Sequence, residues 1–175
     1  MLHQVKILNT NHSYLRQNPE NLVQTDQGLS FQDKVRAFEA LCRKAGLKLT
    51  HQRLEIYREL ASTYDHPSAD DVYKRVQKRI PTISIDTVYR TLLTFEHFGV
   101  ATRVHAFDGQ ARFDADVSSH QHLACIRCKS IQDFDWEAFD QMKPPAKTKK
   151  WGKVESRHVV LKGICKKCLE KSHQE

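Results

Sequence analysis

The chain has 175 residues, a formal net charge of +7 at pH 7 and a sequence pI of about 9.2. Its 39% hydrophobic and 28% charged residues are ordinary for a globular protein that buries a core in one or two domains. The N-terminal stretch lacks an apolar run and a small-residue cleavage site, and no segment could span a membrane. We therefore expect a cytoplasmic protein, and the positive charge permits a polyanionic partner without establishing one.

Four helices are predicted after a polar, Asn- and Gln-rich stretch at residues 1–30, which we expect to be a mobile N-terminal arm of unassigned role. The helices begin after Ser or Thr caps and show apolar residues at helical spacing. We place them at residues 31–46, 50–61, 68–80 and 84–98, with Pro81 ending the third. In the fourth, the expected buried stripe is Ile85, Val88, Leu92 and Phe95.

The hydrophobic period changes from helical to alternating at residues 101–107. The pair Asp108-Gly109 is a strong two-residue turn signal, and residues 110–114 form the returning strand. Helices followed by a hairpin predict a winged helix-turn-helix domain over residues 31–114, with the fourth helix in the major groove of DNA. An α+β domain without a DNA role remains the alternative.

Residues 115–175 predict a second, small α/β domain built around two CxxC motifs. We expect strands at residues 122–125 and 130–135, a short helix at 136–142, an exposed lysine-rich loop after Pro144-Pro145, and a strand at 154–164. Such a sheet is too small to be stable alone. We therefore expect a bound metal ion to cross-link it and a second chain to cover its remaining apolar face in a homodimer. The predicted fold class is thus α+β: a winged helix-turn-helix domain followed by a dimerisation domain.

The two CxxC motifs predict a structural zinc site. A CxxC turn brings both sulfurs to one side, so two such turns complete a tetrahedron around Zn²⁺. In the reducing cytoplasm such paired motifs favour metal over disulfide, although a redox dithiol is the alternative. The four predicted ligands are Cys125, Cys128, Cys165 and Cys168.

A second set of metal-ligand residues surrounds the first CxxC motif and contains no sulfur. His120 and His122 are one residue apart and would point to the same side of a strand, while Asp114 and Asp133 flank them along the chain. Two imidazoles and two carboxylates suit Fe²⁺, Mn²⁺ or Zn²⁺. An ion here would tie the DNA-binding part to the sheet, although a strand with no ligand role is the alternative.

Taken together, these motifs resemble the ferric uptake regulator superfamily. The resemblance covers about residues 33–170, and the matching stretches are AGLKLTHQR, DHPSADDVY, SIDTVYRTL, ARFD, HQHLACIRC and GICKKC. It implies a homodimeric, metal-dependent repressor that binds a double-stranded operator, A/T-rich and palindromic. It also implies that the chain is not an enzyme, and that a Cys₄ zinc and a regulatory metal between the domains are present.

The resemblance adds one regulatory ligand, His66, which spacing did not identify. The implied ligand set is then His66, Asp114, His120, His122 and Asp133. Aspartate at positions 114 and 133 is similar to the peroxide-sensing branch, in which Fe²⁺ promotes oxidation of a ligand histidine by hydrogen peroxide. The alternative is an iron- or zinc-responsive repressor without peroxide sensing.

The resemblance also implies which residues contact DNA. Tyr89 and Arg90 lie in the motif of the fourth helix, Lys48 matches a residue that reaches the minor groove, and Arg53 and Arg103 are expected phosphate contacts. The chain departs from the family pattern at Arg157, where members often carry a histidine, and the role of the neighbouring His158 is open.

Two other functional classes also use zinc held by cysteine and histidine. A zinc deaminase would pair a catalytic Glu with a His/Cys ligand set, as H-x-E with P-C-x-x-C. Here no Glu lies within the predicted metal cluster and no Pro precedes either CxxC motif. A zinc-stabilised scaffold without DNA binding is the other alternative.

Overall fold

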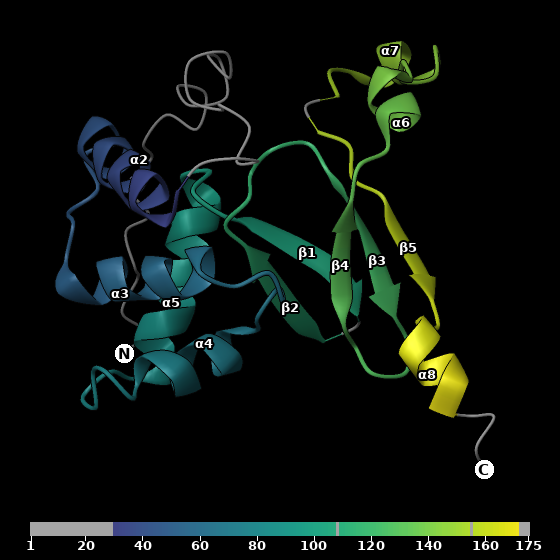
Figure 1. Ribbon diagram of the computed structural model, residues 1–175. Coiled ribbons are helices and arrows are strands. Elements are labelled where there is room, and N and C mark those ends of the chain that lie inside the picture. Colours follow the sequence, from purple (N-terminus) through teal and green to yellow (C-terminus); the bar gives the residue numbers. More distant parts are fainter. Residues whose placement is uncertain (1–29, 108, 155, 172–175) are drawn as a thin grey trace, which may run out of the picture.

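A computed structural model describes residues 30–107, 109–154 and 156–171, so the expected arm at residues 1–30 lies outside the described residues except for Ser30. The described chain is a mixed α/β structure in which a hairpin separates four helices from a three-stranded sheet (Figure 1). The elements are α2 (Phe31–Lys44), α3 (His51–Ala61), α4 (Ala69–Val76), α5 (Ile85–His97), β1 (Thr102–Phe107), β2 (Gln110–Asp114), β3 (Gln121–Cys125), β4 (Ile131–Phe134), α6 (Glu137–Gln141), α7 (Thr148–Trp151), β5 (Val160–Gly163) and α8 (Lys166–Lys171).

Helices α2 to α5 surround the larger hydrophobic core. Each begins where the sequence predicted, because the side chain of its Ser or Thr cap accepts a hydrogen bond from the backbone N–H three residues later. The core includes Phe38 of α2, whose ring stacks on Tyr57 of α3 at a centroid distance of 4.0 Å and meets Phe95 of α5 edge-on. Phe113 of β2 is fully buried in the same core.

The β1–β2 hairpin contacts both halves of the molecule. Its strands are antiparallel, and Phe107 pairs with Gln110 across the two-residue connection that the sequence predicted. Val104 and Ala106 of β1 face the other sheet and form a second core with residues of β3 and β4. The hairpin is therefore packed between the helices and the three-stranded sheet.

The three-stranded sheet has the order β4-β3-β5. Strands β3 and β4 are antiparallel, as expected for the two arms of the first CxxC turn, and β5 runs parallel to β3. The predicted fold class, helices and hairpin followed by a small sheet, is confirmed. No helix among the described residues has the length and apolar character needed to cross a membrane.

Several predicted details were wrong. The third helix ends at Val76, and the chain continues through turns in which Arg79 and Ile80 donate to the carbonyl of Val76. Ile85 is 44% exposed, because the first turn of α5 extends beyond the core.

The C-terminal part also differs from expectation. The strand predicted at residues 154–164 is confined to β5, because only Val160–Gly163 pairs with β3. The predicted lysine-rich loop contains the short helix α7, and α8 was not predicted.

Candidate metal centres and nucleic-acid interface

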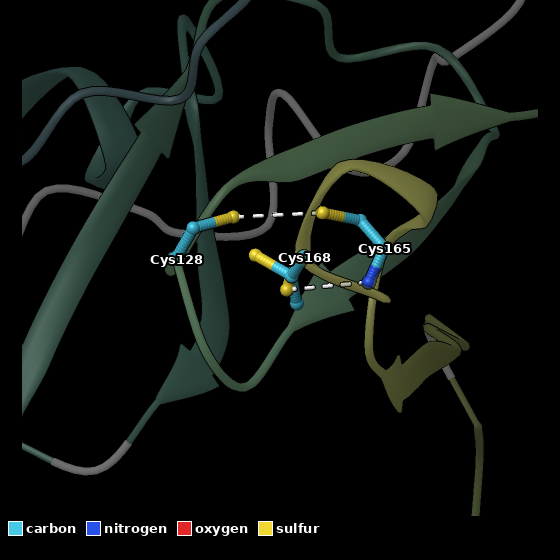
Figure 2. Close-up of side chains that lie close together, drawn as sticks. Cys128, Cys165 and Cys168 are labelled. Carbon is cyan, nitrogen blue, oxygen red and sulfur yellow. Dashed lines mark hydrogen bonds between the residues drawn. The ribbon is translucent and has the colours of Figure 1, made fainter. Parts of the chain in front are cut away.

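The four cysteines of the CxxC motifs converge at the end of the sheet. Figure 2 shows three of them, Cys128, Cys165 and Cys168, close together. Cys125 closes β3, Cys128 follows in the turn, and Cys165 and Cys168 lie at the start of α8. Their sulfur atoms all lie within 4.8 Å of one another, and the Cys128 and Cys165 sulfurs are 3.7 Å apart. Zn–S bonds of about 2.3 Å at a tetrahedral angle would place two sulfurs about 3.8 Å apart, so the four positions fit Zn²⁺.

The pKa values of these thiols also suit a site for a bound cation. Backbone N–H groups of Cys165 and Cys128 lower the pKa of Cys125 to about 6, so one thiolate forms readily. Burial and the neighbouring thiols raise the pKa of Cys168 to about 12. Ionisation of Cys168 is therefore unfavourable unless a cation is bound among the sulfurs.

A loop between α3 and α4 carries His66 to the second cluster. His66 adopts a left-handed backbone conformation, with φ of +50°, which is unfavourable for a residue with a side chain. The loop is held there because the carbonyl of Pro67 accepts a hydrogen bond from the N–H of Phe113 at 3.0 Å. Arg112 donates to the carbonyl of His66 at 3.3 Å. The side chain of His66 thereby lies beside Asp114, the last residue of β2.

Strands β3 and β4 supply the rest of the second cluster. His122 of β3 is the direct cross-strand neighbour of Asp133 of β4, and His120 precedes β3 on the same side. The Nε2 atom of His66 lies 2.8 Å from Oδ1 of Asp133 and 3.2 Å from Oδ2 of Asp114. The Nε2 atom of His120 lies 3.0 Å from Oδ2 of Asp114 and 3.1 Å from Nε2 of His122.

The second cluster fits a divalent first-row ion. Three imidazole nitrogens and two carboxylate oxygens lie within 4.8 Å of one another, and all three histidines present Nε2. Bonds of about 2.0–2.2 Å from one ion would separate neighbouring donors by about 3 Å, as observed. Oδ1 of Asp133 is buried and has no partner of good hydrogen-bond geometry, although Nε2 of His66 lies 2.8 Å away. Nδ1 of His120 lies 3.1 Å from the carbonyl of Ser118, a contact that turns Nε2 toward the cluster.

The charges of the second cluster also favour a bound cation. Burial would lower the pKa of His66, but Asp114 and Asp133 outweigh it and raise that pKa to about 9. Contact with Asp114 likewise raises the pKa of His120. Burial would raise the pKa of Asp114, but the three imidazoles bring it well below its usual range. Two carboxylates in this buried position thus demand positive charge, which a proton or a metal ion can provide.

Four of the five residues expected to contact DNA lie on the exposed surface of α3, α5 and the segment before α3. Lys48, Arg53 and Arg90 line one shallow groove together with Thr50 and Thr87. The Arg53 guanidinium donates to the carbonyl of Lys48, and Arg90 pairs with Asp86 at 3.2 Å. Tyr89 is exposed on α5.

Arg103 has a different setting. Arg103 belongs to β1, and its side chain forms an ion pair with Glu96 of α5. Its guanidinium carbon lies 5.8 Å from the centroid of the Phe113 ring. Its side chain is 23% exposed. To contact DNA, Arg103 would have to leave Glu96 or share its guanidinium between Glu96 and a phosphate.

Comparisons with known proteins point to one family. The model of the Ferric uptake regulator family matches residues 44–162. The peroxide-responsive repressor PerR of Staphylococcus epidermidis is 33% identical over 134 residues, covering 77% of this chain and 89% of the repressor.

Solved structures of ferric uptake regulators resemble most of the fold. The ferric uptake regulator of Pseudomonas aeruginosa with manganese aligns with a TM-score of 0.61 and 30% identity, covering 73% of this chain and 97% of the other. That of Francisella tularensis with iron aligns with a TM-score of 0.61 and 26% identity, covering 71% and 96%.

Proposed function

Because the chain belongs to the Ferric uptake regulator family, we propose that it is a metal-dependent transcriptional repressor that binds DNA as a homodimer. Members of this family are transcription regulators rather than enzymes. In this proposal, residues 31–114 form the DNA-binding domain and residues 115–175 the dimerisation domain. The operator is double-stranded, A/T-rich and palindromic, and the protein acts in the cytoplasm, where its thiols stay reduced.

One observation carries this proposal: the five nitrogen and oxygen donors that converge from both halves of the chain. His66 comes from the helical half, Asp114 from the end of the hairpin, and the other three donors from the sheet. In the proposal His66, Asp114, His120, His122 and Asp133 bind the regulatory Fe²⁺ or Mn²⁺. Their shared ion would fix the angle between DNA-reading helix and sheet, and the zinc held by Cys125, Cys128, Cys165 and Cys168 would keep the sheet folded.

DNA contact is proposed for the basic groove and the exposed face of α5. Lys48 reaches toward the minor groove, Arg53 binds phosphate, and Tyr89 and Arg90 face the major groove. Arg103 is the fifth proposed contact, and it would need to exchange its Glu96 partner for a phosphate.

The finer proposal is that the protein senses hydrogen peroxide. It is supported by the 33% identity to a peroxide-responsive repressor and by aspartate at positions 114 and 133. A bound Fe²⁺ would supply the electron-transfer chemistry that reduces H₂O₂. In net terms, one peroxide oxygen enters the imidazole ring of His66 or His120 and the other leaves as water. Loss of that ligand would open the cluster and release the DNA.

Metal dependence is tested with Asp133→Ala. This variant should lose Mn²⁺-dependent retardation of operator DNA in a gel-shift assay and keep one zinc per chain, because Asp133 is not near the cysteines. The matched control is Asp70→Ala, which removes an exposed carboxylate of α4 that pairs with Lys74. Undiminished, metal-dependent DNA binding by Asp133→Ala would exclude the assignment of the regulatory site.

Peroxide sensing is tested by peptide mass spectrometry of Fe²⁺-loaded protein after H₂O₂ treatment. One added oxygen atom on His66 or His120, and none in Mn²⁺-loaded protein, is the expected result. No histidine oxidation would favour the second candidate, an iron- or zinc-responsive repressor. That candidate is supported by the related structures that contain iron or manganese.

A further inference from the structure

A cavity of about 230 Å³ adjoins the histidine–aspartate cluster. One wall comes from α2, the end of α3 and the residues that follow α3, and the other comes from β4 and the segment after β2. Three of the five cluster residues, Asp114, His120 and Asp133, line it. The other two, His66 and His122, are buried and do not line it. The cluster is therefore approached from solvent on one side, through this cavity.

Two further carboxylates line the cavity and are not among the five donors. Asp116 lies two residues after Asp114, and Asp135 lies two residues after Asp133. The backbone N–H of Ser118 donates to Oδ1 of Asp116 at 2.8 Å, and the N–H of Asp116 donates to Oδ1 of Asp114 at 2.8 Å. These bonds fix the Asp116 carboxylate at the wall, between the bulk solvent and the cluster.

The opposite wall carries a basic and an aromatic side chain. Nζ of Lys34, on α2, lies 5.6 Å from the ring centroid of Tyr64, and both residues line the cavity. Four aspartates line the cavity against two basic side chains, Lys34 and His120, so its lining carries an excess of negative charge. Low-dielectric walls concentrate such a field and raise the local concentration of cations.

We infer that this cavity is the route by which a divalent cation reaches the regulatory cluster, and that Asp116 and Asp135 draw the cation in without binding it in the final site. The inference rests on the proposed function, because it presupposes that the cluster binds a metal ion. It assigns to Asp116 and Asp135 a role in the rate of metal binding and to Lys34 an opposing one. Small neutral molecules such as H₂O₂ would use the same opening and would be indifferent to its charge.

The test measures association and dissociation rates of Co²⁺, whose visible absorption in a nitrogen–oxygen site reports binding. The full-length, zinc-loaded protein is mixed with Co²⁺ in a stopped-flow instrument at low and high ionic strength. Asp116→Asn and Asp135→Asn should each slow association about threefold, and the double variant about tenfold, with little change in dissociation. The difference should vanish at high salt, and Lys34→Ala should bind faster than the unmodified protein.

Asparagine keeps the size of the side chain and, at position 116, the acceptor for Ser118, so these variants change charge alone. The matched control is Asp70→Asn, an exposed carboxylate on α4 outside the cavity, which should leave both rates unchanged. Association rates equal to the unmodified protein would overturn the inference. So would an unchanged association rate with faster dissociation, because Asp116 or Asp135 would then stabilise the bound ion. If the unmodified protein bound no Co²⁺ at this cluster, the proposed function itself would fail.

Discussion

Glu55 is a buried carboxylate of the helical half, and it is only 8% exposed. Arg58 and Arg79 each donate to its carboxylate at 2.8 Å. Burial alone would raise the pKa of Glu55, but the two arginines outweigh it, and its pKa lies below the ordinary value. The carboxylate therefore joins α3 to the turn after α4.

Replacing Glu55 with Gln should destabilise the protein at neutral pH. Both arginines are partly exposed, so solvent screening limits the loss to about 1–2 kcal/mol. Because the folded pKa is depressed, the stabilisation is present above the unfolded pKa of about 4.3 and is lost as pH falls through the folded value. Urea unfolding at several pH values should show the gap between Glu55→Gln and the unmodified protein closing on acidification. A gap that widened below pH 4 would contradict this account, and Asp70→Asn should cost less than about 0.5 kcal/mol at every pH.

The five cysteines divide into two chemical environments. Cys165 is one of four that converge on a single point, whereas Cys42 is buried in the helical core, where burial raises its thiol pKa. Cys165→Ser should abolish stoichiometric zinc and remove the sheet from the cooperative unfolding transition, since the zinc-binding energy is also folding energy. Elemental analysis and far-UV circular dichroism measure both effects. Cys42→Ala should keep its zinc, and retention of zinc by Cys165→Ser would contradict the assignment.

Glycines with positive φ end two of the helices. Gly46 after α2 and Gly99 after α5 each have φ of +66°, and a Cβ atom at either would meet nothing within 4 Å. Only backbone conformation therefore penalises alanine there, by about 1 kcal/mol.

Thermal or urea unfolding of Gly99→Ala should show this loss. Gly163→Ala is the matched control, because that glycine also has free space around it but an ordinary φ, and it should change stability by less than about 0.5 kcal/mol. Equal losses in the two variants would mean that the left-handed conformation is not the cause.

Element starts were predictable from the sequence, and element ends less so. A helix begins at a local signal, since Ser68 both caps α4 and exchanges hydrogen bonds with Asp71. The end of α4 depends on tertiary packing. Ile80 matched the helical periodicity but is buried from a turn, and Ile83, beyond Pro81, is buried in the same core.

Residues before β5 deviate for a similar reason. Arg157 donates to the carbonyls of Phe139 and Asp140 at the end of α6 and stacks on the Phe139 ring, which keeps this segment out of the sheet. Helix α8 begins at the second CxxC turn, where Cys168 and Leu169 donate to the carbonyl of Cys165. Its six residues are too few to show a period in the sequence.

The candidate sites were predictable to different degrees. The two CxxC motifs and the His120–His122 pair are local patterns, and the structure brings each set together. His66 has no local signal, because it is 48 residues from Asp114 and belongs to a loop of the helical half. Its inclusion came from family resemblance, and spacing alone could not have provided it. The cross-strand pairing of His122 with Asp133 also depends on a register that the sequence does not specify.

At the scale of the whole molecule, an apolar contact and the metal-ligand cluster both join the halves of the described chain. Val104 and Ala106 of β1 pack against Ala124 and Ile131 of the sheet, and the five-donor cluster spans the same boundary. The apolar contact holds the halves together without an ion. In the proposed function, metal binding would therefore need only to adjust the angle between two halves already in contact, which a bond network at one point can do.

The face of the sheet opposite this contact carries two exposed leucines. Leu123 of β3 and Leu161 of β5 are neighbours in register and are 41% and 43% exposed. Their strands bury the other face against the hairpin through Ala124 and Val160. In a homodimer with twofold symmetry, the same two leucines of both chains would be buried in one interface. This face is therefore where we expect the partner chain to pack.

Leu161→Asp should convert the dimer into a monomer. Losing two buried leucine side chains per dimer costs about 3 kcal/mol or more, which corresponds to a greater than hundredfold rise in the dimer Kd. Sedimentation equilibrium should detect the monomer, and operator binding should weaken because one chain would read only half of the proposed palindromic site. The variant should still bind zinc and Co²⁺, because Leu161 touches neither cluster. The control Phe31→Ser removes an exposed apolar side chain from α2, and it should leave the dimer intact. A fully dimeric Leu161→Asp would place the interface elsewhere.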